Sequence, residues 1–397
     1  MSRRDGGEAQ AGAPGPAGLF PQEEYAARLA AVRRAMAARD VALLLLSAPE
    51  NIFYLTGLDH WGYFAPHILA VPAEGEMLLV TRAMERVSVA QRVRNARFEG
   101  HRDDETAADG LGRALSGDRF AASRIGIEAW SAGLPHGLAQ AVQQLFPNAR
   151  WVDLSGLVDD LRLVKSPAEQ ARLRQAAAVS DAGAAAAIAA IAAGNSERQV
   201  AAACERAMIE AGGTFPGFGP FIRSTARLGE EHGTWTDHRV AAGEAVFLEL
   251  AGCVARYHAP LGRLVHVGAA TEGDRLMAAV CREAFDAVLE ALRCGVTFGD
   301  VYAAWQRVVD RAGLAHYRRH HCGYAVGIGF PPSWTGGNKV TGLAPDSPRE
   351  LKPGMAFHVL SWLMGTGRGD FFLSNTVLLA AAGPEVLTRT PADIIVR

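Results

Sequence analysis

The chain has 397 residues, of which 49% are hydrophobic and 21% are charged, so it can bury a large core and is long enough for two domains. Its formal net charge of −2 gives no electrostatic reason to expect nucleic acid or an anionic membrane as a partner. Five cysteines without CxxC spacing argue against a disulfide framework or a zinc knuckle, and we expect reduced thiols in a cytoplasmic protein.

Residues 1–19 are rich in Gly, Ala and Pro and predict a disordered tail. No apolar stretch follows the basic residues near the start, so we expect neither a signal peptide nor a membrane anchor there. Residues 20–163 predict a small N-terminal α/β domain. It begins with a helix whose apolar residues have helical spacing, continues with the buried strand VALLLLS, and then alternates strands and turns.

Residues 164–397 predict a second domain that begins with a long helix, with Ser166 as N-cap and Pro167 at the first position. Within this domain, residues 194–213 resemble residues 295–314 at a constant offset of 101 residues. The N-cap candidate Ser196 matches Thr297 in this alignment. The repeat predicts two α,α,β units related by a pseudo-twofold axis, with a site between their sheets.

Several motifs carry a family resemblance: NIFYLTGL in the first domain, RLVKSPAEQ at the junction, and KPGMAFHV and SNTVLL near the C-terminus. Together with the duplicated helices they resemble the superfamily of creatinase, prolidase and methionine aminopeptidase. The resemblance implies an α+β fold, in which a small creatinase-like α/β domain precedes a C-terminal catalytic domain of the pita-bread type. Most members of this superfamily bind two divalent metals through two aspartates, a histidine and two glutamates.

The resemblance places those five ligand positions at Glu249, Pro260, Tyr324, Leu360 and Ser374. Only Glu249 is a carboxylate, and a dinuclear site needs several anionic oxygens to replace the water around its ions. We therefore expect no metal and no other cofactor, as in creatinase. A metallopeptidase is the least favoured interpretation.

The segments ELAG, RYHAP, CGYAVGIGFPPSW and PGMAFHVLSWL are most similar to ectoine hydrolases. That resemblance implies a metal-independent hydrolase that opens a small cyclic amidine at a carbon–nitrogen bond. One departure is Ser374, since ectoine hydrolases keep a glutamate there. Glu249 suits the chemistry, because a carboxylate between Phe247 and Leu250 in a buried strand loses hydration that an amidinium cation would replace.

Glu249 is the predicted nucleophile or general base, although a structural glutamate hydrogen-bonded across a sheet would have the same local pattern. His232 and Tyr324 are the candidates for proton transfer or hydrogen-bond donation. Histidine titrates near neutrality without help, and a phenol stays neutral at working pH. His258, close to the position of the second metal ligand, could orient Glu249 or bind a substrate carboxylate.

Arginine and aromatic side chains are the candidates for substrate binding, because a guanidinium grips a carboxylate and indole faces attract delocalised cations. They are Arg263, Trp334, Trp362, Trp61, Tyr63 and Phe64. A sheet-surface salt bridge is an alternative role for Arg263. Family precedent adds a homodimer in which the first domain of one subunit leans over the neighbour's site. His358 and Cys322 are expected in the core.

The leading interpretation is therefore an ectoine hydrolase-like enzyme that acts on a small cationic or zwitterionic molecule. A second interpretation keeps the enzyme but changes its substrate to another amidine, a guanidine or a lactam. A third is a catalytically dead member of the fold that only binds a ligand. Retention of Glu249, His232 and Tyr324 argues against the third.

Overall fold

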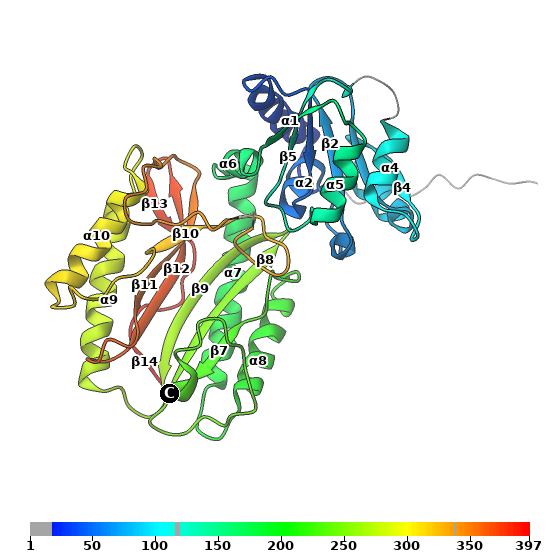
Figure 1. The fold of residues 1–397 in the computed structure, drawn as a ribbon. Helices are drawn as coiled ribbons and strands as arrows, with labels where there is room; N and C mark the ends of the chain where they lie inside the picture. The colour runs from blue at the N-terminus through cyan, green and yellow to red at the C-terminus, as the bar shows by residue number, and fades with distance from the viewer. Residues whose placement is uncertain (1–17, 116–119, 337–338) are drawn as a thin grey trace, which may run out of the picture. The chain divides into compact units, whose positions relative to one another are not determined.

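The structure is a computed structural model that describes residues 18–115, 120–336 and 339–397 (Figure 1). Residues 1–17 of the predicted disordered tail lie outside these described residues. The chain divides into two compact units, of which the first ends at Ser155 and the second starts at Gly156. In the described ranges, no helix is long and apolar enough to cross a membrane.

The first unit is built on a six-stranded sheet with the order β4-β3-β2-β1-β5-β6. β1 reads LLLL and is buried throughout, as is typical of a central strand covered on both faces. It pairs antiparallel with β2 and in parallel with β5, so the sheet is mixed. The strands are β1 (Leu43–Leu46), β2 (Ile68–Pro72), β3 (Met77–Arg82), β4 (Ala96–His101), β5 (Arg124–Ile127) and β6 (Arg150–Asp153). The helices are α1 (Gln22–Ala37), α2 (Pro49–Thr56), α3 (Arg86–Arg92), α4 (Ala107–Ala114) and α5 (His136–Gln144), with short 3₁₀ turns η1 (Gly62–Phe64) and η2 (Ala83–Glu85).

The second unit contains a mostly antiparallel sheet whose main path is β10-β11-β12-β9-β8-β7. β13 pairs with β12, and β14 near the C-terminus pairs in parallel with β9. The strands are β7 (Phe221–Ser224), β8 (Ala245–Val254), β9 (Tyr257–His266), β10 (Gly323–Ala325), β11 (Ala356–Leu363), β12 (Phe371–Ala380), β13 (Gly383–Val386) and β14 (Ile395–Val396).

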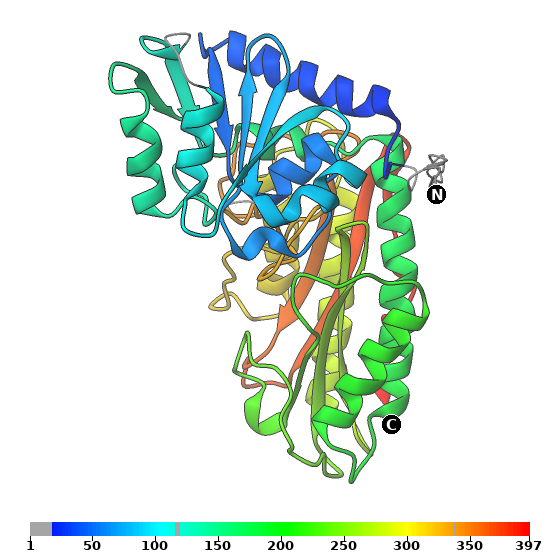
Figure 2. The same cartoon turned by 90° about the vertical axis from the view of Figure 1, so that its right-hand side faces the viewer.

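Two pairs of helices cover strands of this sheet: α7 packs on β8 and β9, and α9 packs on β11 and β12 (Figure 1). Figure 2 shows α7 and α8, in green, side by side along one side of the strands. The helices are α6 (Leu157–Arg162), α7 (Pro167–Ala190), α8 (Glu197–Glu210), α9 (Glu272–Ala291) and α10 (Phe298–Arg311), with the 3₁₀ turn η4 (Thr225–Arg227) after β7.

The predicted repeat and fold class are confirmed, but the expected separate sheets are not: the strands of both repeats form one eight-stranded sheet. Ser196 caps α8 and Thr297 caps α10, and each helix spans 14 residues. Both caps are capping boxes, in which the N-cap side chain and the side chain three residues later satisfy each other's backbone N–H. Ser166 caps α7 in the same way, with Pro167 at its first position as predicted.

The helix α6 lies in the second compact unit, which starts at Gly156. The carboxylate of Asp160 pairs with Arg349 at 2.8 Å. The backbone N–H of Lys165 donates to the carbonyl of Gly354 at 2.9 Å. These contacts connect the segment that precedes α7 to the second unit.

Side chains of β8 alternate between two cores, as the pleat of a strand requires. Leu248 and Leu250 belong to the core beneath α7 and α8. Phe247 and Ala251 belong to the core on the other face. Glu249 lies between Phe247 and Ala251 in this alternation, so it shares their face and points away from α7 and α8.

Candidate active site

Strand register places Glu249 in a row of residues that crosses the sheet. Glu249 is opposite Phe221 on β7 and opposite Gly262 on β9. Gly262 faces Ser374 on β12, and Ser374 faces Leu360 on β11. Because directly opposite residues share a face, this row brings together three of the five expected metal-ligand positions, namely Glu249, Ser374 and Leu360.

Glu249 is a buried carboxylate with few partners. Its exposed fraction is 7%, it makes no hydrogen bond within the described ranges, and its Oε1 lies 3.9 Å from Nδ1 of His358. Burial raises the pKa of Glu249 to about 7, while the positive charge of Arg223 opposes the shift. A carboxyl group with this pKa changes its protonation state near neutral pH, as catalytic bases and nucleophiles often do.

Tyr324, His358 and Ser374 form a chain of hydrogen bonds beside Glu249. The Tyr324 hydroxyl lies 2.8 Å from Nδ1 of His358, and Nε2 of His358 lies 2.7 Å from the Ser374 hydroxyl. The indole N–H of Trp334 donates to the Tyr324 oxygen at 3.0 Å. Burial lowers the pKa of His358 to about 3, so its ring stays neutral and carries one N–H. When Ser374 donates to Nε2, Nδ1–H donates to Tyr324, and the phenol proton can be donated elsewhere.

The five positions assigned to metal ligands do not fit a dinuclear centre. Pro260 and Leu360 have no donor atom in their side chains, and the hydroxyls of Tyr324 and Ser374 both bond the same histidine. Across the described ranges, no group of three or more His, Cys, Asp or Glu side chains is arranged to hold a metal ion. One carboxylate cannot replace the hydration of two divalent ions, so we assign no catalytic step to a metal.

Two arginines bring positive charge to the surroundings of Glu249. The guanidinium carbon of Arg223, on β7, lies 4.1 Å from the centroid of the Phe247 ring. The guanidinium carbon of Arg319 lies 4.9 Å from the Trp362 ring. Glu231 connects the two: its carbonyl accepts a hydrogen bond from Arg223 at 3.1 Å, and its carboxylate accepts one from Arg319 at 2.9 Å. The segment around Glu231 is thereby held by both arginines.

Four of the predicted site residues lie near Glu249 or contact the residues around it. Tyr324 contacts His358, and Trp334 contacts Tyr324. Trp362 lies 5.3 Å from Phe247, the neighbour of Glu249 on the same face, measured between ring centroids. His232 is exposed, and its ring centroid lies 5.9 Å from that of Phe221, the residue opposite Glu249.

Both ring nitrogens of His258 form hydrogen bonds with backbone groups. His258 pairs with Cys253, further along β8 than Glu249. Its Nε2 accepts a hydrogen bond from the N–H of Gly217, and its Nδ1 donates to the carbonyl of Arg256, both at 2.9 Å. Burial lowers the pKa of His258 to about 4, so the ring is neutral. Its position supports a structural role for this histidine.

The side chain of Arg263 points to the opposite face from Glu249. Its neighbour Gly262 is the residue opposite Glu249, and consecutive side chains of a strand alternate between faces. The fully buried guanidinium donates to four backbone carbonyls and one amide oxygen, those of Gly262, Ser374, Thr390, Pro391 and the side chain of Asn375. Arg263 therefore ties the C-terminal segment to the sheet and does not face Glu249.

The other predicted aromatic residues belong to the first unit. Trp61 is 55% exposed and Phe64 is 77% exposed. The Tyr63 hydroxyl donates to the carbonyl of Leu58 at 3.3 Å. Their action in a neighbouring subunit's site stays a prediction.

The sequence did not predict a site role for three residues near Glu249. His358 is buried, as expected for the core, but it links Tyr324 to Ser374. Arg223 stands in the short strand FIRS, and a charge inside a buried strand is the same signal that singled out Glu249. Arg319 had no comparable signal, because its partner Glu231 is 88 residues away in the chain.

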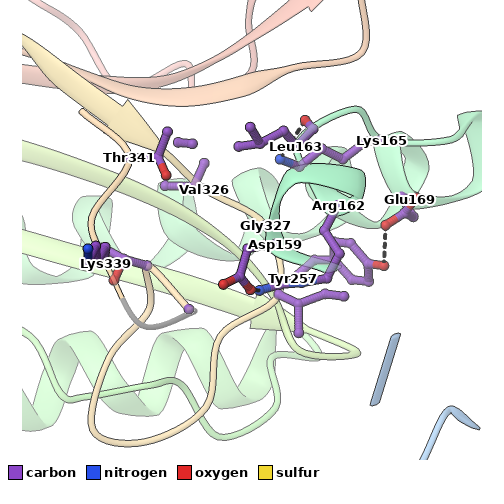
Figure 3. A pocket seen from close by; sticks show the side chains of 14 residues that line it. Asp159, Arg162, Leu163, Lys165, Glu169, Tyr257, Val326, Gly327, Lys339 and Thr341 are labelled. Atoms are coloured by element: carbon purple, nitrogen blue, oxygen red, sulfur yellow. Dashed lines mark hydrogen bonds and ion pairs between the residues drawn. The ribbon is translucent and has the colours of Figure 1, made fainter. Parts of the chain in front are cut away.

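A separate pocket lies beside the loop that precedes α7 (Figure 3). Lys165 lines it with Asp159 and Tyr257, and the Lys165 ammonium donates to the carbonyl of Leu163 at 3.0 Å. Burial lowers the pKa of Lys165 to about 7. The cavity measures about 40 Å³, which is room for water rather than for a ring-shaped substrate. Glu249 is absent from its lining.

Comparison with known proteins decides the family. The model of metallopeptidase family M24 matches residues 171–381, and that of the creatinase/prolidase N-terminal domain matches residues 28–164. The chain belongs to metallopeptidase family M24. An Xaa-Pro dipeptidase from Bacillus anthracis superposes on this M24 chain with a TM-score of 0.82 at 20% identity, covering 94% of this chain and 100% of that one. That likeness confirms the two-part fold expected from the creatinase and prolidase resemblance.

Two curated relatives of this M24 chain match it over nearly their whole length. The ectoine hydrolase of Halomonas elongata is 28% identical over 396 residues, with 95% of this chain and 98% of that protein covered. An uncharacterized hydrolase/peptidase of Sinorhizobium fredii is 28% identical over 393 residues, with the same coverage. The similarity therefore extends over both units.

Proposed function

We propose that this M24 protein is a metal-independent hydrolase that opens a small cyclic amidine at a carbon–nitrogen bond, with ectoine as the first substrate to test. One observation carries the proposal: Glu249 is a buried carboxylate with no side-chain hydrogen bond in the described ranges, at a family metal-ligand position whose four companions provide no further carboxylate or imidazole. The similarity to the ectoine hydrolase of Halomonas elongata supports the substrate class.

An amidinium cation is the kind of ligand that compensates such a carboxylate. In the free protein, burial disfavours the ionised form of Glu249 and raises its pKa to about 7. A cation placed beside it favours the ionised form, so substrate and carboxylate stabilise each other in a site with little water. The Trp362 ring already stacks against the Arg319 guanidinium, so a substrate-binding role for this ring stays a prediction.

The reaction adds one water molecule across the amidine. Either the Glu249 carboxylate attacks the amidine carbon, one ring carbon–nitrogen bond breaks and a water then hydrolyses the resulting acyl imidate, or Glu249 removes a proton from the water that attacks. A carbon–oxygen bond forms, one ring carbon–nitrogen bond breaks, and the departing nitrogen takes up a proton. A methyl-substituted ring gives an N-acetylated diamine, and Glu249 returns to its initial state.

Tyr324 is the proposed donor to the departing nitrogen, because it is the hydroxyl at the end of the chain that continues through His358 to Ser374. Burial and the negative charge of Glu249 both raise the pKa of Tyr324, so the phenol keeps its proton at working pH. His232 is exposed on the segment next to Glu231, and its role as a proton-transfer group is part of this proposal.

The test is a proton NMR time course with ectoine, run in parallel for the wild-type protein and for Glu249→Gln. The proposal predicts signals of an acetylated diaminobutyrate with the wild type and none with the variant. If ectoine stays unchanged while a known ectoine hydrolase converts it, ectoine is the wrong substrate. A panel of other cyclic amidines, guanidines and lactams then separates the alternative hydrolase from a protein that only binds its ligand.

A further inference from the structure

Two arginines near Glu249 have more N–H groups than partners. Nε and Nη2 of Arg223 and Nε of Arg319 are buried without a hydrogen-bond partner in the part of the chain that the structure describes. The side chain of Arg223 is fully buried. Buried guanidinium donors are normally paired, since an unpaired one loses its hydration without compensation. Unused donors of this kind on the catalytic face indicate an anionic ligand.

The chain itself provides a carboxylate at this place. The Glu231 carboxylate accepts a hydrogen bond from Nη1 of Arg319 at 2.9 Å, although 47% of the Glu231 side chain is exposed. The Arg319 guanidinium also stacks on Trp362, and the Trp362 ring lies 5.3 Å from that of Phe247, on which Arg223 stacks. An exposed glutamate can be displaced by a ligand at low cost, because water solvates its released carboxylate.

We propose that Arg319, backed by Arg223, is a carboxylate-binding subsite of the active site, and that Glu231 occupies it until the substrate's own carboxylate takes its place. The substrate class is then a zwitterion that combines an amidinium, placed at Glu249, with a carboxylate, placed at Arg319. This inference rests on the proposed function. It also transfers to Arg319 the carboxylate-binding role that the sequence suggested for Arg263.

Charge balance favours such a zwitterion over a plain cation. Arg223 and Arg319 carry two positive charges, and Glu231 with ionised Glu249 carries two negative ones. A bare amidinium would add a positive charge next to two arginines, which costs Coulomb energy in a poorly hydrated site. A zwitterion adds no net charge, and each of its two charged groups meets a group of opposite sign.

The test compares two ligands that differ only in the carboxylate: ectoine and the same methylated cyclic amidine without its carboxylate. Binding is measured by calorimetry in the Glu249→Gln background, where no turnover interferes. Arg319→Gln should weaken the binding of ectoine by about tenfold to a hundredfold, because ectoine loses a charge-assisted hydrogen bond. It should not weaken the binding of the other ligand, which loses only a neighbouring positive charge. Glu231→Gln should increase the affinity for ectoine only, because the Glu231 carboxylate no longer competes for Arg319.

Arg318→Gln is the matched control, because Arg318 is the neighbouring arginine and pairs with Asp310 instead. It should change neither affinity. If neither amidine binds to the wild type or to Glu249→Gln, the proposed function fails, and L-proline against pyrrolidine then tests the carboxylate subsite alone. With either pair of ligands, tighter binding of the carboxylate-bearing ligand that disappears in Arg319→Gln supports the subsite. The inference is overturned if no pair shows a preference, or if the preference survives in Arg319→Gln.

Discussion

Glu249 and Arg263 are buried charges on neighbouring strands, one residue apart in register and on opposite faces of the sheet. On the helix side, Arg263 donates hydrogen bonds to five acceptors. On the other side, Glu249 makes no hydrogen bond within the described ranges and has His358 at 3.9 Å. The guanidinium of Arg263 connects the strands to the C-terminal segment, whereas we propose that a substrate cation pairs with the carboxylate of Glu249.

The largest expected effect is on activity. Glu249→Gln should lower kcat/KM by at least about a thousandfold, because the amide can neither attack the amidine carbon nor accept a proton. Far-ultraviolet circular dichroism should show an unchanged fold. Activity within tenfold of the wild type would remove Glu249 from the chemistry and leave it, like Arg263, a structural residue.

Arg263→Met should lower the free energy of unfolding by about 3 kcal/mol, because several buried carbonyls lose their donor at once. Denaturation by urea, followed by intrinsic tryptophan fluorescence, measures the loss. The exposed Arg318→Met serves as its control and should change stability by less than about 0.5 kcal/mol. A stable Arg263→Met protein with weakened substrate binding would instead support the substrate-binding role first suggested for this arginine.

Glu249→Gln should have the opposite effect on stability. Burial raises the pKa of Glu249 from 4.5 to about 7, so the folded state binds the proton more tightly than the unfolded state does. The wild type therefore loses stability as the pH rises from the unfolded pKa through the folded one, whereas a neutral glutamine loses none. We expect the variant to be more stable by on the order of 2 kcal/mol at pH 8 and equal to the wild type near pH 4. Thermal unfolding at both pH values measures this, and a variant less stable at pH 8 would contradict the account.

The smallest effect concerns the hydrogen-bond chain. Ser374→Ala removes the hydroxyl that bonds Nε2 of His358, so the tautomer that leaves the Tyr324 proton available becomes less favoured. We expect kcat to fall by about tenfold with KM unchanged, because Ser374 acts through His358 rather than on the substrate. Steady-state kinetics of Ser374→Ala and Tyr324→Phe provide the comparison. Tyr324→Phe should lower kcat further, because it removes the proposed proton donor itself. A change in KM alone would place Ser374 in substrate binding.

Local sequence patterns predicted the elements and their repetition well. Capping boxes at Ser196 and Thr297 mark helix starts through contacts within one turn, so the offset of 101 residues was already visible in the sequence. Glu249 was also visible, because a carboxylate inside an apolar strand is uncommon without a compensating partner.

The face of the sheet on which the Arg263 side chain lies depends on a turn that has no recognisable sequence signal. β8 and β9 are joined through Ala255 and Arg256, both with positive φ, in a two-residue hairpin without the usual Asn or Gly. This turn fixes the register, and a slip of one residue would have moved Arg263 to the other face. The partners of Arg319 and His358 come from distant segments, so no local pattern could identify them.

The most direct measurement is ectoine turnover by chelator-treated protein whose metal content is determined on the same sample. The account predicts a rate equal to that of untreated protein, with no stoichiometric metal, because one carboxylate and a chain of neutral hydrogen-bonding groups stand where the family binds two ions. Loss of turnover on treatment, with recovery on adding a divalent ion such as Mn²⁺, would contradict it.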